Sequence, residues 1–132
     1  MLIDNFLLFW VNNTPFQGQT IYSSPNSSLN DGTCDILELR AKQGGRVSLT
    51  NFLLKQENGK HINKEGECVI KGLKYFKTKL WRLFPKRSLK DEDVFYKTKK
   101  LPKYYSIDGE RYPIEPIQVK VLPSKLRIFC LN

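Results

Sequence analysis

The sequence is poor in the residues from which metal sites and disulfide frameworks are built. It has one histidine, His61, and three scattered cysteines, Cys34, Cys68 and Cys130, with no CxxC pair and no secretory hydrophobic segment. Such sites need closely spaced cysteines or histidines, so we expect neither a disulfide framework nor a metal site. A reducing cytosolic compartment is the default for such thiols. A single histidine after a helix end is more often solvated or dipole-compensating than catalytic.

The common local motifs of nucleotide-binding and hydrolytic enzymes are also missing. The sequence has no GxxxxGK[ST], GxGxxG, HExxH or GxSxG pattern. These patterns provide the phosphate-cradling loop, the zinc ligands or the nucleophile of their enzymes. We therefore expect no triphosphate-binding loop and no catalytic residue in this chain.

Long hydrophobic runs are absent. The longest extends from Phe6 to Val11, whereas a membrane span needs roughly 20 apolar residues. We expect no bilayer-crossing segment, although peripheral membrane contact stays open. A run of strand length that is apolar on both faces indicates a strand buried from both sides, or one that another part of a larger protein covers.

Positive charge is abundant and uneven. The net charge is +9, from 22 basic and 13 acidic residues, and the stretch from Lys71 to Lys103 holds twelve basic but only three acidic residues. This excess suggests an anionic partner. It could attract anionic lipid at roughly 1 kcal/mol per basic residue, or follow nucleic-acid phosphates with Tyr75, Phe76 and Trp81 as stacking platforms. A solvated loop with a chance surplus of charge fits equally well.

The 132 residues, 40% of them hydrophobic and 12% aromatic, predict one globular domain of mainly β structure. Short apolar or alternating runs separated by turn residues predict about seven to eight strands and favour a β-sandwich with one α-helix. Expected strands include Phe6 to Val11, Gln17 to Tyr22, Cys34 to Arg40 and Lys77 to Leu83. Residues 84–103 lack periodicity and are interpreted as a projecting basic loop.

The helix is predicted over Arg46 to Asn58, with Gly59 placed for a C-cap. Its apolar face carries Leu49, Phe52 and Leu53, followed by Gln56. By default such a stripe packs against a sheet, but periodicity alone does not distinguish a core from the wall of an acyl-chain pocket.

Two hairpins are predicted near the end of the sequence. Asp108-Gly109 lies between two alternating runs, and both positions of a type I′ turn need φ > 0, which this pair tolerates. This signal indicates only a hairpin, although carboxylates at the turn could reach a metal-bound phosphate. The second hairpin joins Ile117 to Val121 with Leu126 to Cys130 through Pro123-Ser124-Lys125.

The order and spacing of several segments resemble the C-terminal lobe of the sphingosine kinase and diacylglycerol kinase superfamily, and sphingosine kinases most. The similarity extends over nearly the whole chain, and its most specific part is the Asp-Gly-Glu turn with the following Val-Leu-Pro hairpin. The segments are Thr14-Pro15-Phe16-Gln17-Gly18, Pro25, Asp31-Gly32, Gly59-Lys60-His61, Trp81-Arg82-Leu83-Phe84-Pro85, Ser106-Ile107-Asp108-Gly109-Glu110 and Val119-Lys120-Val121-Leu122-Pro123-Ser124-Lys125-Leu126.

The resemblance implies a two-lobed lipid kinase that transfers the γ-phosphoryl group of ATP, with Mg²⁺, to a lipid hydroxyl. The missing N-terminal lobe would carry the Gly-Gly-Asp-Gly-Thr nucleotide loop and the activating acidic residue. The present chain would then be the β-sandwich lobe, from a truncated gene product or gene model, and inactive alone. Asp108, Gly109 and Glu110 would approach the nucleotide phosphates. The lipid would contact Gln17, Ile21, Leu37, Phe52, Leu53, Gln56 and His61.

The resemblance also implies partners. They are a sphingoid base or acylglycerol substrate, the N-terminal kinase lobe and an anionic membrane surface, with peripheral membrane association from the cytoplasm and no nucleic acid. A different class of function stays open beside it. The chain would then be a stand-alone basic β-domain that binds nucleic acid or anionic membrane.

Overall fold

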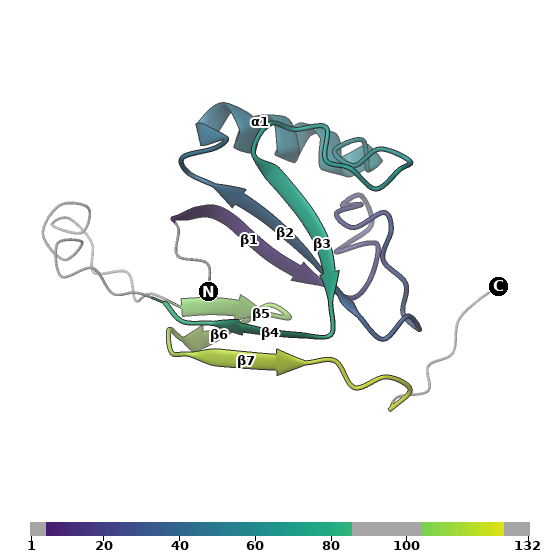
Figure 1. Ribbon diagram of the computed structural model, residues 1–132, viewed down its shortest axis with the longest axis vertical. Coiled ribbons are helices and arrows are strands. Elements are labelled where there is room, and N and C mark those ends of the chain that lie inside the picture. The colour runs from purple at the N-terminus through teal and green to yellow at the C-terminus, as the bar shows by residue number, and fades with distance from the viewer. Residues whose placement is uncertain (1–4, 86–103, 126–132) are drawn as a thin grey trace, which may run out of the picture. The chain divides into compact units, whose positions relative to one another are not determined.

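The computed structural model describes residues 5–85 and 104–125. Within them the chain forms seven strands and one α-helix, which confirms the prediction of a mainly β fold (Figure 1). The elements are β1 (Phe6–Asn12), β2 (Cys34–Arg40), α1 (Gly45–Lys55), the 3₁₀ turn η1 (Gln56–Asn58), β3 (Leu73–Thr78), β4 (Leu80–Leu83), β5 (Tyr104–Ile107), β6 (Glu110–Pro113) and β7 (Ile117–Lys120).

The described residues fall into two compact units. The first unit contains residues 5–79 and 121–125, and the second contains 80–85 and 104–120. The association of all strands in a single sandwich domain stays a prediction. The predicted basic loop at 84–103 lies almost entirely outside the described residues. Neither helix in the described part is long and apolar enough to cross a membrane.

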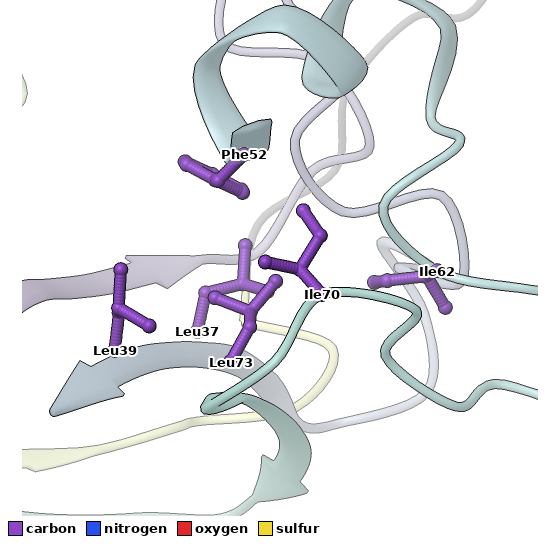
Figure 2. Packing of buried hydrophobic residues seen from close by; sticks show 6 residues of the cluster. All are labelled: Leu37, Leu39, Phe52, Ile62, Ile70 and Leu73. Atoms are coloured by element: carbon purple, nitrogen blue, oxygen red, sulfur yellow. The ribbon is translucent and has the colours of Figure 1, made fainter. Parts of the chain in front are cut away.

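The first unit is a three-stranded antiparallel sheet covered on one face by α1 (Figure 1). Its central strand β2 is buried at six of its seven positions. Because successive side chains of a strand point to opposite faces, Leu37 and Leu39 share one side of the sheet. They pack there with Phe52 of α1 and with Leu73 at the start of β3 (Figure 2). Ile62 and Ile70 complete this cluster.

Helix α1 begins one residue before the predicted Arg46 and ends at Lys55, three residues before the predicted Asn58. It continues into η1, and Gly59 follows in the left-handed conformation, with φ 65°. The predicted apolar stripe is wrong in one member. Phe52 is fully buried and Leu49 is partly buried, but Leu53 is 46% exposed. Leu53 lies about 100° around the helix from Phe52, and the buried position on the opposite flank is taken by Ser48.

Two predicted strands differ from the observed structure. Gln17 to Tyr22 forms no strand. Its backbone hydrogen bonds instead close a turn, from Gln17 N–H to the Ile21 carbonyl, and reach the helix end, from Tyr22 N–H to the Gln56 carbonyl. The run from Lys77 to Leu83 is divided at Lys79, so that β3 pairs with β2 and β4 pairs with β7. Contacts with distant parts of the chain, rather than local alternation, determine the structure of both segments.

The second unit contains two antiparallel strand pairs, β4 with β7 and β5 with β6. The β5–β6 hairpin confirms the predicted turn, with Asp108 at φ 51° and Gly109 at φ 86°. Positive φ at both positions is the requirement of a type I′ turn. The first arm of the second predicted hairpin is β7, whereas its partner, Leu126 to Cys130, lies outside the described residues.

Candidate lipid-binding site

The centre of the first unit brings together three of the residues predicted to contact lipid. Leu37 of β2 and Phe52 of α1 are completely buried and point toward one another (Figure 2). The Phe52 ring also makes edge contacts with Trp10 of β1, at 5.6 Å between ring centroids, and with His61, at 5.2 Å. These residues form one apolar cluster between the sheet and the helix.

The interpretation of His61 as a solvated residue is wrong, because its side chain is fully buried. Its Nε2 lies 2.8 Å from the carbonyl oxygen of Ser23. A carbonyl can only accept, so Nε2 carries the hydrogen. Burial lowers the pKa of His61, while the carbonyls of Ser23 and Lys55 act in the opposite direction. The ring is therefore a neutral donor that ties the loop at Ser23 to the apolar cluster.

Gln56 borders the same cluster at the end of the helix. Its side chain is buried, and Oε1 has no hydrogen-bond partner among the described residues. Its backbone carbonyl accepts a hydrogen bond from Tyr22 N–H at 3.1 Å. Gly59 follows, and a Cβ there would lie 2.6 Å from the Tyr22 ring. The helix end and the loop at Tyr22 are thus closely packed.

Asn12 organises the polar side of this region, although it was not among the predicted site residues. Its Nδ2 donates to Ser24 Oγ at 2.8 Å and to Ser23 Oγ at 3.2 Å. Its Oδ1 accepts from Gln17 Nε2. Both serines are fully buried, although they belong to a stretch of turn-forming residues that is usually exposed. The available signal was an amide directly after an apolar strand.

The remaining predicted lipid contacts lie farther out. Gln17 is exposed and Ile21 is partly buried. Leu53 points away from the apolar cluster and is largely exposed. The structure thus places Leu37, Phe52 and His61 in one cluster with Gln56 at its border, links Gln17 to it through Asn12, and leaves Leu53 on the outer surface. The role of these residues in binding lipid stays a prediction.

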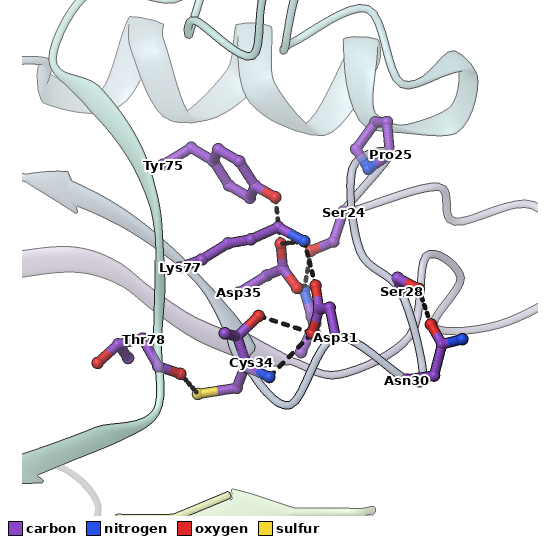
Figure 3. Close-up of polar contacts among 12 residues, drawn as sticks. Ser24, Pro25, Ser28, Asn30, Asp31, Cys34, Asp35, Tyr75, Lys77 and Thr78 are labelled. Carbon is purple, nitrogen blue, oxygen red and sulfur yellow. Dashed lines mark hydrogen bonds and ion pairs between the residues drawn. The ribbon is translucent and has the colours of Figure 1, made fainter. Parts of the chain in front are cut away.

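A second polar cluster, buried at Asp35 and exposed at Asp31 and Lys77, joins β2 and β3 (Figure 3). Asp35 is fully buried and its Oδ1 accepts a hydrogen bond from the Tyr75 hydroxyl. Lys77 Nζ lies 3.7 Å from the same oxygen and 2.5 Å from Asp31 Oδ2. Burial and the bond to Asp35 raise the pKa of Tyr75. The hydrogen bonds from Lys77 and Thr33 lower the pKa of Asp31 from 3.8 to about 2.

We predict that Lys77→Gln weakens the acid dependence of folding stability. The lowered pKa of Asp31 stabilises the fold above pH 3.8, and this contribution is lost as the pH falls toward about 2. Without Lys77 the carboxyl titrates closer to 3.8 in the folded state, so less stability is lost in that interval. The free energy of unfolding is measured with urea at neutral pH and at a pH between about 2 and 3.8. At neutral pH we expect Lys77→Gln to lower it by about 1 kcal/mol or less.

Lys74→Gln is the matched control, because Lys74 is an exposed lysine on the same strand. It should leave the acid dependence unchanged. If Lys77→Gln and Lys74→Gln have the same acid profile, the ion pair with Asp31 does not lower the pKa of that carboxyl.

The predicted nucleotide-contacting residues lie on the β5–β6 turn of the second unit. Asp108, Gly109 and Glu110 are all exposed, and a Cβ added at Gly109 would have no atom within 4 Å. The Tyr112 hydroxyl donates to Glu110 Oε2 at 3.0 Å. The turn therefore presents two carboxylates and an open backbone to solvent. Within residues 5–85 and 104–125 no three His, Cys, Asp or Glu side chains are grouped to hold a metal ion.

Comparison with known proteins gives one informative similarity. No protein-family model matches the chain, and no solved structure matches it. The chain is 27% identical over 122 residues to Sphingoid long chain base kinase 4 of Schizosaccharomyces pombe. The match covers 92% of this chain but only 23% of that protein. It relates the chain to a lipid kinase, of which it spans about a quarter of the length.

Proposed function

We propose that the chain is the lipid-binding, C-terminal lobe of an ATP-dependent lipid kinase that phosphorylates the hydroxyl of a sphingoid base. The observation that carries this proposal is the similarity to the sphingoid base kinase along 92% of the chain. The mainly β fold and the Asp-Gly-Glu hairpin agree with the lobe that the sequence resembles. ATP and Mg²⁺ would be bound mainly by the other lobe.

The requirements of phosphoryl transfer indicate what each lobe of the kinase would contribute. This reaction depends on positioning the nucleotide and the acceptor and on stabilising the phosphate charge. The present chain has no glycine-rich phosphate loop. It would supply the acceptor side, while Glu110, presented on a well-defined turn, would act toward the metal-bound phosphates. Activity therefore requires the remainder of the kinase.

The acceptor side is supported by the packing of the first unit. An amphiphile needs an apolar surface for its chain and polar groups at one end of that surface. Leu37 and Phe52 are completely buried, so the partly buried residues packed against them, Trp10 and Leu49, would supply the first. The buried Gln56 amide, whose Oε1 has no partner in the described part, supplies an acceptor at its border.

A kinase assay of the complete gene product tests this function. Sphingosine, diacylglycerol and ceramide are offered in parallel with ATP and Mg²⁺, and phosphorylated lipid is measured. We expect turnover of the sphingoid base above the other two, and none with the 132-residue chain alone. Absence of lipid phosphorylation by the complete product, together with salt-sensitive oligonucleotide binding, would support the basic-domain function instead.

We predict that Glu110→Ala in the complete enzyme lowers kcat by about tenfold or more, as expected for the loss of a preorganised charged group near a transferring phosphoryl. Folding should be unaffected because the side chain is exposed. Glu115→Ala, another exposed carboxylate of the same unit, is the matched control and should retain full turnover. Equal kinetics of both variants and the wild type would remove Glu110 from the site.

A further inference from the structure

The β5–β6 hairpin separates its charged side chains onto two faces. Successive side chains of a strand point to opposite sides, so Glu110 and Tyr112 share one face of β6 and Arg111 lies on the other. On that other face the Arg111 guanidinium stacks over the Tyr104 ring, with 4.8 Å between Cζ and the ring centroid. Such stacking attracts the cation to the aromatic face. The basic residue nearest in sequence is therefore turned away from the Glu110 carboxylate.

One contact holds the Glu110 carboxylate on its own face. The Tyr112 hydroxyl donates to Glu110 Oε2 at 3.0 Å. Within residues 5–85 and 104–125 this is the one hydrogen bond of that carboxylate, and no basic residue forms an ion pair with it. The residue directly opposite Glu110 across the hairpin is Ile107, whose side chain has no polar atom. Tyr112 thus orients the carboxylate and leaves Oε1 available to a partner outside the hairpin.

We propose that Tyr112 is a positioning residue for Glu110. This role rests on the proposed kinase function, in which Glu110 acts toward the metal-bound phosphates of ATP. An exposed glutamate side chain samples several rotamers and loses that freedom when it acts at one defined place. The hydrogen bond from Tyr112 orients the carboxylate before the nucleotide arrives, and electrostatic stabilisation is most effective when the charged group is oriented in advance.

A purely structural role of Tyr112 would depend on its ring rather than on its hydroxyl. Tyr112 lies directly opposite Tyr105 in the β5–β6 pair, and aromatic residues in such cross-strand positions stabilise a sheet. Tyr112→Phe keeps the ring and removes only the hydroxyl that bonds to Glu110. This substitution therefore separates the positioning role from a contribution to the stability of the hairpin.

A double-mutant cycle in the complete gene product tests the proposal. Tyr112→Phe should lower kcat by about threefold to tenfold, as expected when one hydrogen bond is lost, and should leave KM for the lipid unchanged. In a Glu110→Ala background the same substitution should have no further effect, because a positioning residue acts only through the group that it positions. Tyr105→Phe is the matched control. The Tyr105 hydroxyl donates to the Glu115 carbonyl at 3.2 Å, so its loss should leave kcat unchanged.

NMR of the 132-residue chain measures the orientation of Glu110 without kinase activity. Side-chain couplings of Glu110 should indicate one dominant rotamer in the wild type and in Tyr105→Phe, and averaging among rotamers in Tyr112→Phe. The proposal is overturned if the rotamer populations of Glu110 are the same in all three proteins, or if Tyr112→Phe lowers kcat equally with and without the Glu110 carboxylate.

The kinetic results also distinguish this proposal from the proposed function. If the complete gene product phosphorylates no lipid, the kinase function fails, and the role of Tyr112 fails with it. If the complete product phosphorylates lipid but Tyr112→Phe has the kcat of the wild type, the kinase function stands and only the role of Tyr112 is wrong.

Discussion

Phe52→Ala should cost about 3–5 kcal/mol of folding stability, the range observed when a buried phenylalanine is truncated. The ring is fully buried in the apolar cluster of the first unit and makes edge contacts with Trp10 and His61. Truncation removes all three kinds of contact: with the β2 leucines, with the β1 aromatic and with the imidazole. Urea or thermal unfolding of the chain measures the effect, and loss of the cooperative transition is the extreme result.

Leu53→Ala is the control that makes this measurement specific. Leu53 is the next residue in the same helix and is also predicted to contact lipid, but it is 46% exposed. Its truncation should cost less than about 1 kcal/mol, because little apolar surface returns to water. Equal losses for the two variants would contradict the orientation of α1.

The contrast also decides how lipid binding is tested. Loss of lipid binding in a Phe52 variant would be ambiguous, because the side chain supports the core. Leu53 lies outside the apolar cluster, so an effect of its replacement on lipid phosphorylation or vesicle binding would report on contact rather than on folding.

The elements that were predictable from sequence carry strong local chemistry. The β5–β6 hairpin follows from Asp108-Gly109, because few other pairs accept positive φ at both positions. The 3₁₀ turn η1, which continues α1, ends at Gly59 because a left-handed C-cap favours glycine. Strand β2 follows from the alternation of apolar and polar residues between Cys34 and Arg40, although Asp35 and Glu38 turn out to be buried as well. Each of these signals is contained within a few neighbouring residues.

The elements that were missed depend on partners distant in sequence. Ser23 and Ser24 have the composition of a surface loop, yet they are buried because Asn12 and His61 bond to this segment from β1 and from beyond the helix. Likewise, alternation from Lys77 to Leu83 does not reveal the break at Lys79, since the two halves pair with different strands. The residues predicted to contact lipid came from the resemblance alone, and the sequence did not distinguish the buried Leu37 and Phe52 from the exposed Leu53.

Gly72→Ala should destabilise the fold by about 2–5 kcal/mol, combining left-handed strain with overpacking. Gly72 has φ 80°, and a Cβ there would lie 2.6 Å from the carbonyl carbon of Gln43 and 2.7 Å from the Gly44 nitrogen. These are backbone atoms of the turn between β2 and α1, so no side-chain rotation relieves the contact. The substitution would push apart the turn and the start of β3, next to the buried Leu73.

Gly45→Ala separates the two causes. Gly45 has φ 66° but no atom within 4 Å of an added Cβ, so alanine there meets the conformational strain without the clash. Its cost should be about 1–2 kcal/mol, and the difference between the two variants in urea unfolding measures the close approach of Gly72 to the turn. If Gly72→Ala lowers the free energy of unfolding no more than Gly45→Ala does, the backbone at Gln43 and Gly44 moves to accommodate the added Cβ. The spacing between β3 and the β2–α1 turn then does not fix the position of α1.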